Sequence, residues 1–140
     1  DQYFEEFPKI KKYMEFLVSQ ARENEYVETI MGRRRYLKDI NSRNAVIRSV
    51  AERNAINAPI QGSAADIIKK AMIEINMEIY NRKMKSKMLL QVHDELVFDM
   101  YVPERTQLIQ IVKSKMENTI KLDVPLIVDI GEGENWLEAH

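Results

Sequence analysis

Three stretches of the sequence place apolar residues at the spacing of an α-helix. They cover residues 8–24, about 45–82 and 104–120. Because Pro59 removes one backbone hydrogen bond from the middle stretch, we expect a kink or break near Ala58. The apolar residues of these stripes are predicted to form the core: Ile10, Met14, Leu17, Val18, Ala21, Ile67, Ile68, Ala71, Met72, Ile75, Ile79, Leu108, Ile111, Val112, Met116 and Ile120.

Two further stretches have the pattern of antiparallel hairpins. Residues 26–37 are strand-prone on either side of Gly32. Residues 88–100 alternate apolar and polar positions around a two-residue turn, His93-Asp94. Such turns usually require positive φ, and of these two residues we expect Asp94 to adopt it.

An apolar run after Pro125, Leu126-Ile127-Val128, predicts a buried strand near the carboxyl end. The expected order is helix, hairpin, long helix, hairpin, helix and strand, with no internal repeat or linker. This order predicts an α+β fold in which helices pack on an antiparallel hairpin sheet. His140, the last residue, is expected at the surface.

The composition suits a soluble globular protein, with 45% hydrophobic and 31% charged residues among 140. No apolar run approaches the ~20 residues that span a bilayer, and no signal peptide is visible, so we expect a cytoplasmic protein without membrane contact. The absence of cysteine excludes disulfides and thiolate-bound metals. Because the chain begins without methionine and enters helical periodicity at once, we expect a carboxyl-terminal piece of a longer protein.

The turn of the second hairpin carries three ionisable residues, His93, Asp94 and Glu95. Adjacent carboxylates repel each other unless a cation or hydrogen bonds neutralise them, and oxygen ligands of this type suit Mg²⁺. The hairpin is therefore a candidate active site. A charged, solvated hairpin tip is the alternative, because a three-residue motif is short.

Positive charge gathers in the middle of the chain, although the formal net charge is −1. Between residues 33 and 53, seven basic residues outweigh two acidic ones, which leaves a local charge of +5 and includes the triplet Arg33-Arg34-Arg35. Such a stretch suits the phosphates of nucleic acid. An ordinary solvated surface is the alternative.

Arg53, Asn57 and Gln61 recur every four residues and therefore lie along one face of the long helix. Amides donate to and accept from base edges in a groove, and a guanidinium grips a phosphate in a forked geometry. This row predicts a nucleic-acid contact. The alternative is the polar outer face that helices of soluble proteins normally carry.

Two strings resemble the DNA polymerases of family A. They are Arg-Asn-Ala-Ile-Asn-Ala-Pro-Ile-Gln-Gly-Ser-Ala-Ala-Asp-Ile-Ile-Lys (residues 53–69) and Gln-Val-His-Asp-Glu-Leu-Val-Phe (residues 91–98). The Gly-Arg-Arg-Arg-Tyr-Leu hairpin (32–37) and Gly-Glu-Gly-Glu-Asn-Trp (131–136) resemble the same family, so the resemblance spans nearly the whole chain. Small departures, such as Ser63 where threonine is frequent, leave the polar residues intact.

The resemblance implies a palm in which two catalytic aspartates hold two Mg²⁺ ions. By resemblance Asp94 is one of them, Glu95 is an auxiliary carboxylate and His93 contacts the primer terminus. One ion would lower the pKa of the primer 3′-hydroxyl, and the other would stabilise charge on the triphosphate. Two parts of the family pattern do not occur in this sequence: the Asp-Tyr-Ser-Gln-Ile-Glu-like strand that carries the second aspartate, and the fingers helix that holds the incoming nucleotide.

The resemblance also implies DNA contacts. Arg53 would hold the template backbone. Asn57 and Gln61 would probe the minor groove, where every correct base pair offers similarly placed acceptors. The hairpin with Arg33, Arg34 and Arg35 resembles part of the fingers, so the triplet is expected to contact DNA.

The predicted function is part of a DNA-directed DNA polymerase, a nucleotidyltransferase of DNA replication and repair. Its partners would be primer-template DNA and deoxynucleoside triphosphates. Residues from 1 to about 60 would be fingers-proximal, and residues from about 61 to 140 would belong to the palm, with the catalytic hairpin near 88–100. We expect the chain alone to be inactive. The alternatives are a primer-template-binding module without catalysis and a structural fragment that self-associates through exposed apolar surface.

Overall fold

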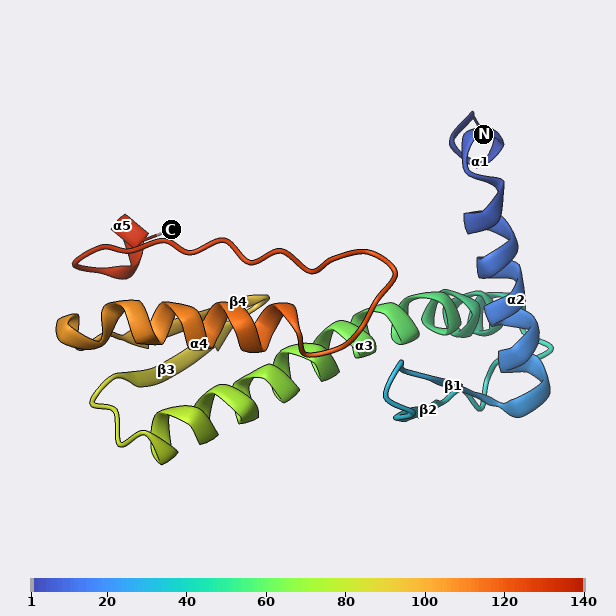
Figure 1. Ribbon diagram of the computed structural model, residues 1–140. Helices are drawn as coiled ribbons and strands as arrows, with labels where there is room; N and C mark the ends of the chain where they lie inside the picture. Colours follow the sequence, from blue (N-terminus) through green and yellow to red (C-terminus); the bar gives the residue numbers. More distant parts are fainter. Residues whose placement is uncertain (1, 140) are drawn as a thin grey trace. The chain divides into compact units, whose positions relative to one another are not determined.

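The computed structural model describes residues 2–139, and its helices and two antiparallel hairpins confirm the predicted α+β fold class (Figure 1). The chain divides into two compact units, one up to Asp66 and one from Ile67 on. His140, predicted at the surface, lies outside the described residues. The elements are α1 (Gln2–Glu6), α2 (Pro8–Asn24), β1 (Tyr26–Glu28), β2 (Arg34–Tyr36), α3 (Ala45–Asn81), β3 (Lys87–Val92), β4 (Glu95–Asp99), the 3₁₀-helix η1 (Val102–Glu104), α4 (Arg105–Glu117) and α5 (Trp136–Ala139).

In the first unit, helix α2 has the predicted bounds because its ends follow local rules. Pro8 opens it, at a position where a helix needs no N–H donor. Glu25 closes it in the left-handed conformation, and its N–H donates to the carbonyl of Ala21 at 2.8 Å. The predicted hairpin follows, with β1 antiparallel to β2 and Gly32 in its turn at a φ of 78°.

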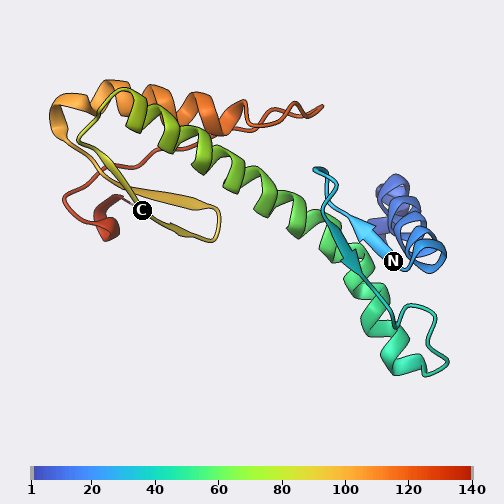
Figure 2. The same ribbon diagram turned by 90° about the horizontal axis from the view of Figure 1, so that it is seen from below.

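The core of the first unit lies between α2, the hairpin and the first half of α3. Figure 2 shows the hairpin beside that half of the helix. The buried residues that pack together come from each of these elements and from the loop that follows β2: Ala21, Val27, Leu37, Ile40, Ala51 and Ala55. This packing fixes the hairpin relative to the start of α3.

Helix α3 is continuous through Pro59, so of the kink or break expected near Ala58 the break does not occur, and the kink stays a prediction. Proline removes a single hydrogen bond, the one that its missing N–H would donate to the carbonyl four residues earlier. The Pro59 carbonyl itself accepts from the Ser63 hydroxyl at 2.5 Å. Pro59 is itself buried, and Ala51 and Ala55 anchor the preceding turns in the core. Tertiary packing therefore retains a helix that the local sequence would interrupt.

In the second unit the β3–β4 hairpin, predicted for residues 88–100, packs with α4 and the second half of α3. The shared core contains Ile75, Ile79, Leu108, Ile111 and Val112. Leu96 and Phe98 of β4 pack against it. The expected alternation fails at Leu90, because an irregularity in the register between Met88 and Leu90 leaves Leu90 44% exposed.

The buried strand predicted after Pro125 is absent, since residues 121–135 form neither helix nor strand. Ile127 is 77% exposed. The sheet of this unit has two strands, β3 and β4, and residues 126–128 pair with neither. An apolar run becomes a strand only where a neighbouring strand accepts its backbone hydrogen bonds. Helix α4 also ends at Glu117, three residues before the predicted end at 120.

Candidate functional site

Strands β3 and β4 meet in a two-residue turn that carries the predicted catalytic residues. Val92 pairs with Glu95, so His93 and Asp94 form the turn. His93 adopts a φ of 53°, and Asp94 is not among the described residues with positive φ, so the conformation expected of Asp94 belongs to His93. Histidine tolerates this region better than most residues. The side-chain amide of Gln91 donates to the carbonyl of His93 and braces the turn.

The turn presents its ionisable side chains to solvent from a supported strand. His93 and Asp94 are exposed, and Glu95 is half-buried. Leu96 and Phe98 of β4 pack against the core cluster that α3 and α4 share. Asp94 is therefore accessible to a ligand, while the strand behind it is fixed in the core.

A hydrogen-bonded clasp closes the base of this hairpin. The Glu104 carboxylate accepts hydrogen bonds from the Lys85 N–H at 2.9 Å, the Ser86 N–H at 2.9 Å and the Ser86 hydroxyl at 2.7 Å. The Ser86 oxygen in turn accepts from the Tyr101 N–H at 3.0 Å. These donors, the Lys85 N–H first, lower the pKa of Glu104 below its ordinary value. The clasp joins the residues that enter and leave the hairpin.

The donor chemistry of the turn fits a magnesium ion in part. Asp94 and Glu95 offer the carboxylate oxygens that Mg²⁺ prefers. Within residues 2–139, no three His, Cys, Asp or Glu side chains gather where they could hold an ion. Proteins commonly hold Mg²⁺ through one or two carboxylates and complete its shell with water and substrate phosphates. Asp94 therefore suits the role of one ligand in a site that takes further oxygens from elsewhere.

Arg53, Asn57 and Gln61 lie along one face of α3, and all three are exposed. In the described part of the chain their side chains form no hydrogen bond or ion pair. The opposite face is buried through Ala51 and Ala55. One cation and two amides are thus held in a row with their hydrogen-bonding groups available to a partner.

The three arginines of the β1–β2 hairpin have different surroundings. Arg34 donates from Nε to Glu28 Oε1 at 2.7 Å and lies 4.5 Å from the centre of the Tyr26 ring. The hydrogen bond to Glu28 is the main cause that raises the pKa of Arg34. Among the described residues Arg35 forms one side-chain hydrogen bond, a long one of 3.5 Å from Nη2 to Asn54 Oδ1.

Arg33 is held from the side of α3. Its Nε donates to Asp66 Oδ1 at 2.9 Å and its Nη2 to the Gly62 carbonyl at 3.2 Å. A pocket of about 90 Å³ brings all three arginines together with Gln61. The first unit therefore gathers the basic triplet and one end of the polar row, while the acidic turn belongs to the second unit.

Several residues that shape these sites were missed in the sequence. Asp66 lies within residues 53–69, which resemble the family. It could have been noticed as a carboxylate between the apolar residues Ala65 and Ile67 of α3, where a charged side chain needs a partner. Ser86 and Glu104 gave no signal, because their contact joins residues 18 apart through a hairpin of specific length.

Comparison with known proteins decides the family. The sequence model of DNA polymerase family A matches residues 1–138, nearly the whole chain. The chain belongs to DNA polymerase family A. The predicted membership is therefore confirmed.

Individual relatives in this family are DNA polymerases I. The chain is 54% identical over 139 residues to that of Streptococcus pneumoniae (strain TIGR4) and 50% identical over 139 residues to that of Bacillus subtilis (strain 168). Each match covers 99% of this chain and 16% of the relative, so the chain spans about one sixth of the length of these family A proteins.

A solved structure gives the same result for the fold. It is the POL domain of Pol1 from M. smegmatis, in complex with DNA primer-template and dNTP. The TM-score is 0.96 at 48% identity, over 99% of this chain and 24% of that one. The structure of residues 2–139 has no helix whose length and hydrophobicity together would carry it through a bilayer.

Proposed function

We propose that this chain supplies the catalytic hairpin and part of the DNA-binding surface of a DNA-directed DNA polymerase. Such an enzyme is a nucleotidyltransferase that adds deoxynucleotides to a primer 3′ end in DNA replication and repair. The strongest support is the TM-score of 0.96 with the POL domain from M. smegmatis, whose complex contains primer-template DNA and dNTP. Those two ligands are the partners we propose for this chain.

In the proposed reaction the oxygen of the primer 3′-hydroxyl attacks the α-phosphorus of the nucleotide. A new oxygen–phosphorus bond forms, and the bond from the α-phosphorus to the bridging oxygen of the β-phosphate breaks, which releases pyrophosphate. The hydroxyl proton passes to solvent. When bound, Mg²⁺ would lower the pKa of the primer 3′-hydroxyl and stabilise the negative charge on the leaving pyrophosphate.

The turn between β3 and β4 has a role for each of its residues in this proposal. Asp94 is proposed as a metal ligand, and its exposure leaves its carboxylate accessible to a cation that would also bind the substrate phosphates. Glu95 is an auxiliary carboxylate beside it. His93 contacts the primer terminus from the same turn, where its backbone adopts the left-handed conformation.

The exposed row on α3 is proposed to contact the primer-template duplex. Arg53 binds the template backbone through its guanidinium. Asn57 and Gln61 hydrogen-bond to acceptors in the minor groove, which lie at similar places in every correct base pair. The hairpin with Arg33, Arg34 and Arg35 adds positive charge next to Gln61.

The assignment of parts to fingers and palm also remains a proposal. Residues up to about 60 are assigned to the fingers-proximal part and later residues to the palm. The division of the structure after Asp66 falls close to that boundary. We infer a cytoplasmic location, since genomic DNA and nucleotides are found there in bacteria such as those of the relatives.

A chimaera tests the proposed function. In it, this chain replaces the corresponding segment of the Streptococcus pneumoniae DNA polymerase I, to which it is 54% identical. We expect the chimaera to extend a primer in the presence of Mg²⁺ and the chain alone to extend none. Extension by the chain alone would refute the proposal that its metal site needs oxygens from elsewhere. An inactive chimaera that is folded and binds DNA would refute the catalytic role.

A binding module without catalysis is a second candidate, favoured by the side chains of Arg53, Asn57 and Gln61, which are exposed and have no hydrogen-bond or ion-pair partner within residues 2–139. It predicts salt-sensitive binding of primer-template by the chain and an inactive chimaera.

Self-association is a third proposal, supported by exposed apolar residues such as Ile73, Met77 and Tyr80 on α3. A sedimentation coefficient that does not change with concentration would contradict it.

A further inference from the structure

A buried carboxylate on α3 joins the helix to the turn of the β1–β2 hairpin. Asp66 is 9% exposed. Its Oδ2 accepts a hydrogen bond from the Thr29 hydroxyl at 2.5 Å, and its Oδ1 accepts one from Arg33 Nε at 2.9 Å. Both donors stand at the ends of the hairpin turn, so one side chain on the helix holds the two arms of the turn.

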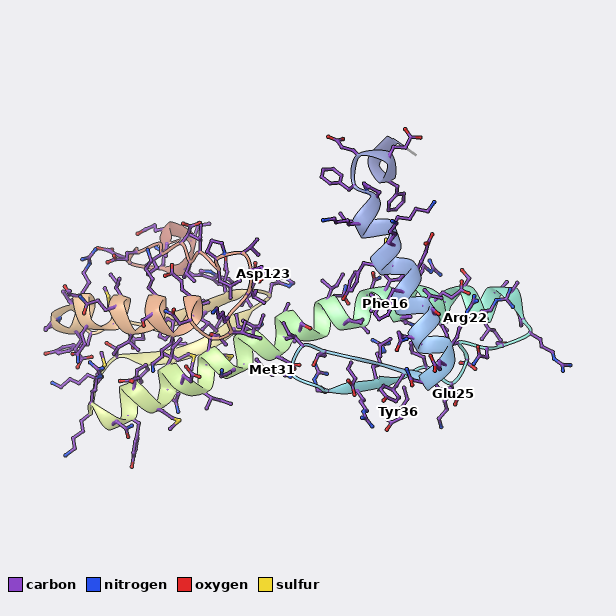
Figure 3. The ribbon with its side chains drawn as sticks, turned by 45° about the vertical axis from the view of Figure 1, so that its right-hand side comes forward. Phe16, Arg22, Glu25, Met31, Tyr36 and Asp123 are labelled. Carbon is purple, nitrogen blue, oxygen red and sulfur yellow. The ribbon has the colours of Figure 1, made fainter. Side chains whose placement is uncertain are left out.

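Further contacts close the same turn on the helix. The Thr29 hydroxyl accepts from the Arg33 N–H at 3.1 Å, and Arg33 Nη2 donates to the Gly62 carbonyl at 3.2 Å. The Ile30 N–H donates to the Ser63 hydroxyl at 2.8 Å. Figure 3 labels Met31 at this turn and Tyr36 on β2, at the other end of the hairpin. The turn is therefore bound to one side of α3 by side chains and backbone together.

Gly62 permits this approach. A Cβ atom at that position would lie 2.6 Å from Thr29 Cγ2, which is closer than two carbon atoms can come without a shift. The hairpin turn thus rests on the backbone of α3, one residue from Gln61 of the exposed row.

The strand register separates the roles of the arginine triplet. Arg34 is opposite Glu28, and these two pair with each other on one face of the hairpin. Arg35 is opposite Val27, which is buried, so Arg35 shares the face that meets α3, where its Nη2 lies 3.5 Å from Asn54 Oδ1. Arg33 stands before β2 and is engaged by Asp66 and Gly62.

We propose that Asp66 is a positioning residue for nucleic-acid contact, which holds the β1–β2 turn on α3 through Thr29 and Arg33. We call this set of three residues the turn latch. In it Arg33 serves to fix the hairpin, and Arg35 is the arginine of the triplet that meets the phosphate backbone. The inference rests on the proposed DNA-binding function and assigns the residues that shape its surface.

The direction in which Asp66→Asn changes the affinity for DNA distinguishes a positioning role from simple long-range electrostatics. Asp66→Asn removes a negative charge, so long-range attraction alone predicts tighter binding to DNA. Loss of the latch predicts weaker binding, because the charged hydrogen bond between Arg33 and the buried Asp66 is lost and the hairpin moves on the helix. Glu28→Gln is the matched control, since it removes a negative charge from the same hairpin at an exposed ion pair.

The affinity of each variant for DNA is measured by fluorescence anisotropy with a labelled primer-template duplex at several salt concentrations. We expect Asp66→Asn to weaken binding about tenfold and Glu28→Gln to leave it equal or tighter. Thr29→Val breaks the latch without changing charge and is expected to weaken binding as well. Arg35→Ala is expected to lower the slope of log affinity against log salt by about 0.9. Asp66→Asn binding that is equal to or tighter than wild type would overturn the proposal.

Hydrogen exchange of the amides of residues 29–33 reports on the latch without DNA. Asp66→Asn and Thr29→Val should speed their exchange about tenfold, whereas Arg34→Ala, which removes an exposed pair, should not. If the wild-type chain does not bind DNA, the proposed binding fails, and unchanged exchange in Asp66→Asn would independently refute the latch. Exchange that rises in Asp66→Asn and Thr29→Val would support the latch even then.

Discussion

Replacement of Ser86 by alanine tests whether the clasp at the base of the β3–β4 hairpin stabilises the fold. Ser86 is 1% exposed, and its hydroxyl forms hydrogen bonds of 2.7 Å to Glu104 and 3.0 Å from the Tyr101 N–H. Loss of two buried hydrogen bonds at roughly 1 kcal/mol each predicts a decrease of about 2 kcal/mol in the free energy of unfolding. At about 3 °C per kcal/mol for a chain of this size, the melting temperature should fall by about 6 °C.

Urea denaturation followed by circular dichroism measures this free energy of unfolding. Ser49→Ala is the matched control, because Ser49 is exposed on α3 and its side chain forms no hydrogen bond in the described chain. We expect the control to stay within about 0.5 kcal/mol of wild type. If Ser86→Ala also stays within that margin, the clasp does not contribute to stability and the reasoning from its hydrogen bonds is refuted.

Further predictions concern pH, close packing and DNA. Because the folded state lowers the pKa of Glu104, its carboxylate contributes stability above the ordinary pKa of 4.5, and this contribution is lost as pH falls through the lower folded value. In urea titrations the difference in free energy of unfolding between wild type and Glu104→Gln should therefore shrink at acid pH. A difference that stays constant with pH would contradict the clasp. Gly62→Ala should speed hydrogen exchange at Thr29, since its Cβ would meet that side chain at 2.6 Å, and unchanged exchange would count against the close approach. Arg53→Ala should weaken primer-template binding and reduce the slope of log affinity against log salt by about 0.9. Asn57→Ala should weaken binding without changing that slope. Equal slopes in the two variants would exclude a phosphate contact by Arg53.

Elements that depend on local patterns were predictable from the sequence. The start of α2 followed from Pro8 and its approximate length from the apolar stripe that reaches Ala21, and α3 followed from its periodicity. The exposed row on α3 followed from spacing alone, since residues four apart share a helix face.

Elements that depend on distant partners were not predictable in the same way. Residues 126–128 have the composition of a strand but lack a neighbouring strand, so they form none. The helix survives Pro59 because the core retains the preceding turns. The contact between Thr29 and Asp66 joins residues 37 apart, and no local pattern indicates which carboxylate will meet which hydroxyl.

The most direct test of the catalytic role compares two aspartates of the same hairpin in the Streptococcus pneumoniae chimaera. Asp94 lies in the turn, and Asp99, exposed at the far end of β4 opposite Lys87, is the control. The measurement is the rate of single-nucleotide incorporation at saturating primer-template and nucleotide. We predict that Asp94→Asn lowers this rate about a thousandfold or more, as expected for a lost ligand of a catalytic metal worth several kcal/mol, with primer-template still bound. Asp99→Asn should leave the rate near that of the parent chimaera, and equal rates in the two variants would contradict the assignment of Asp94.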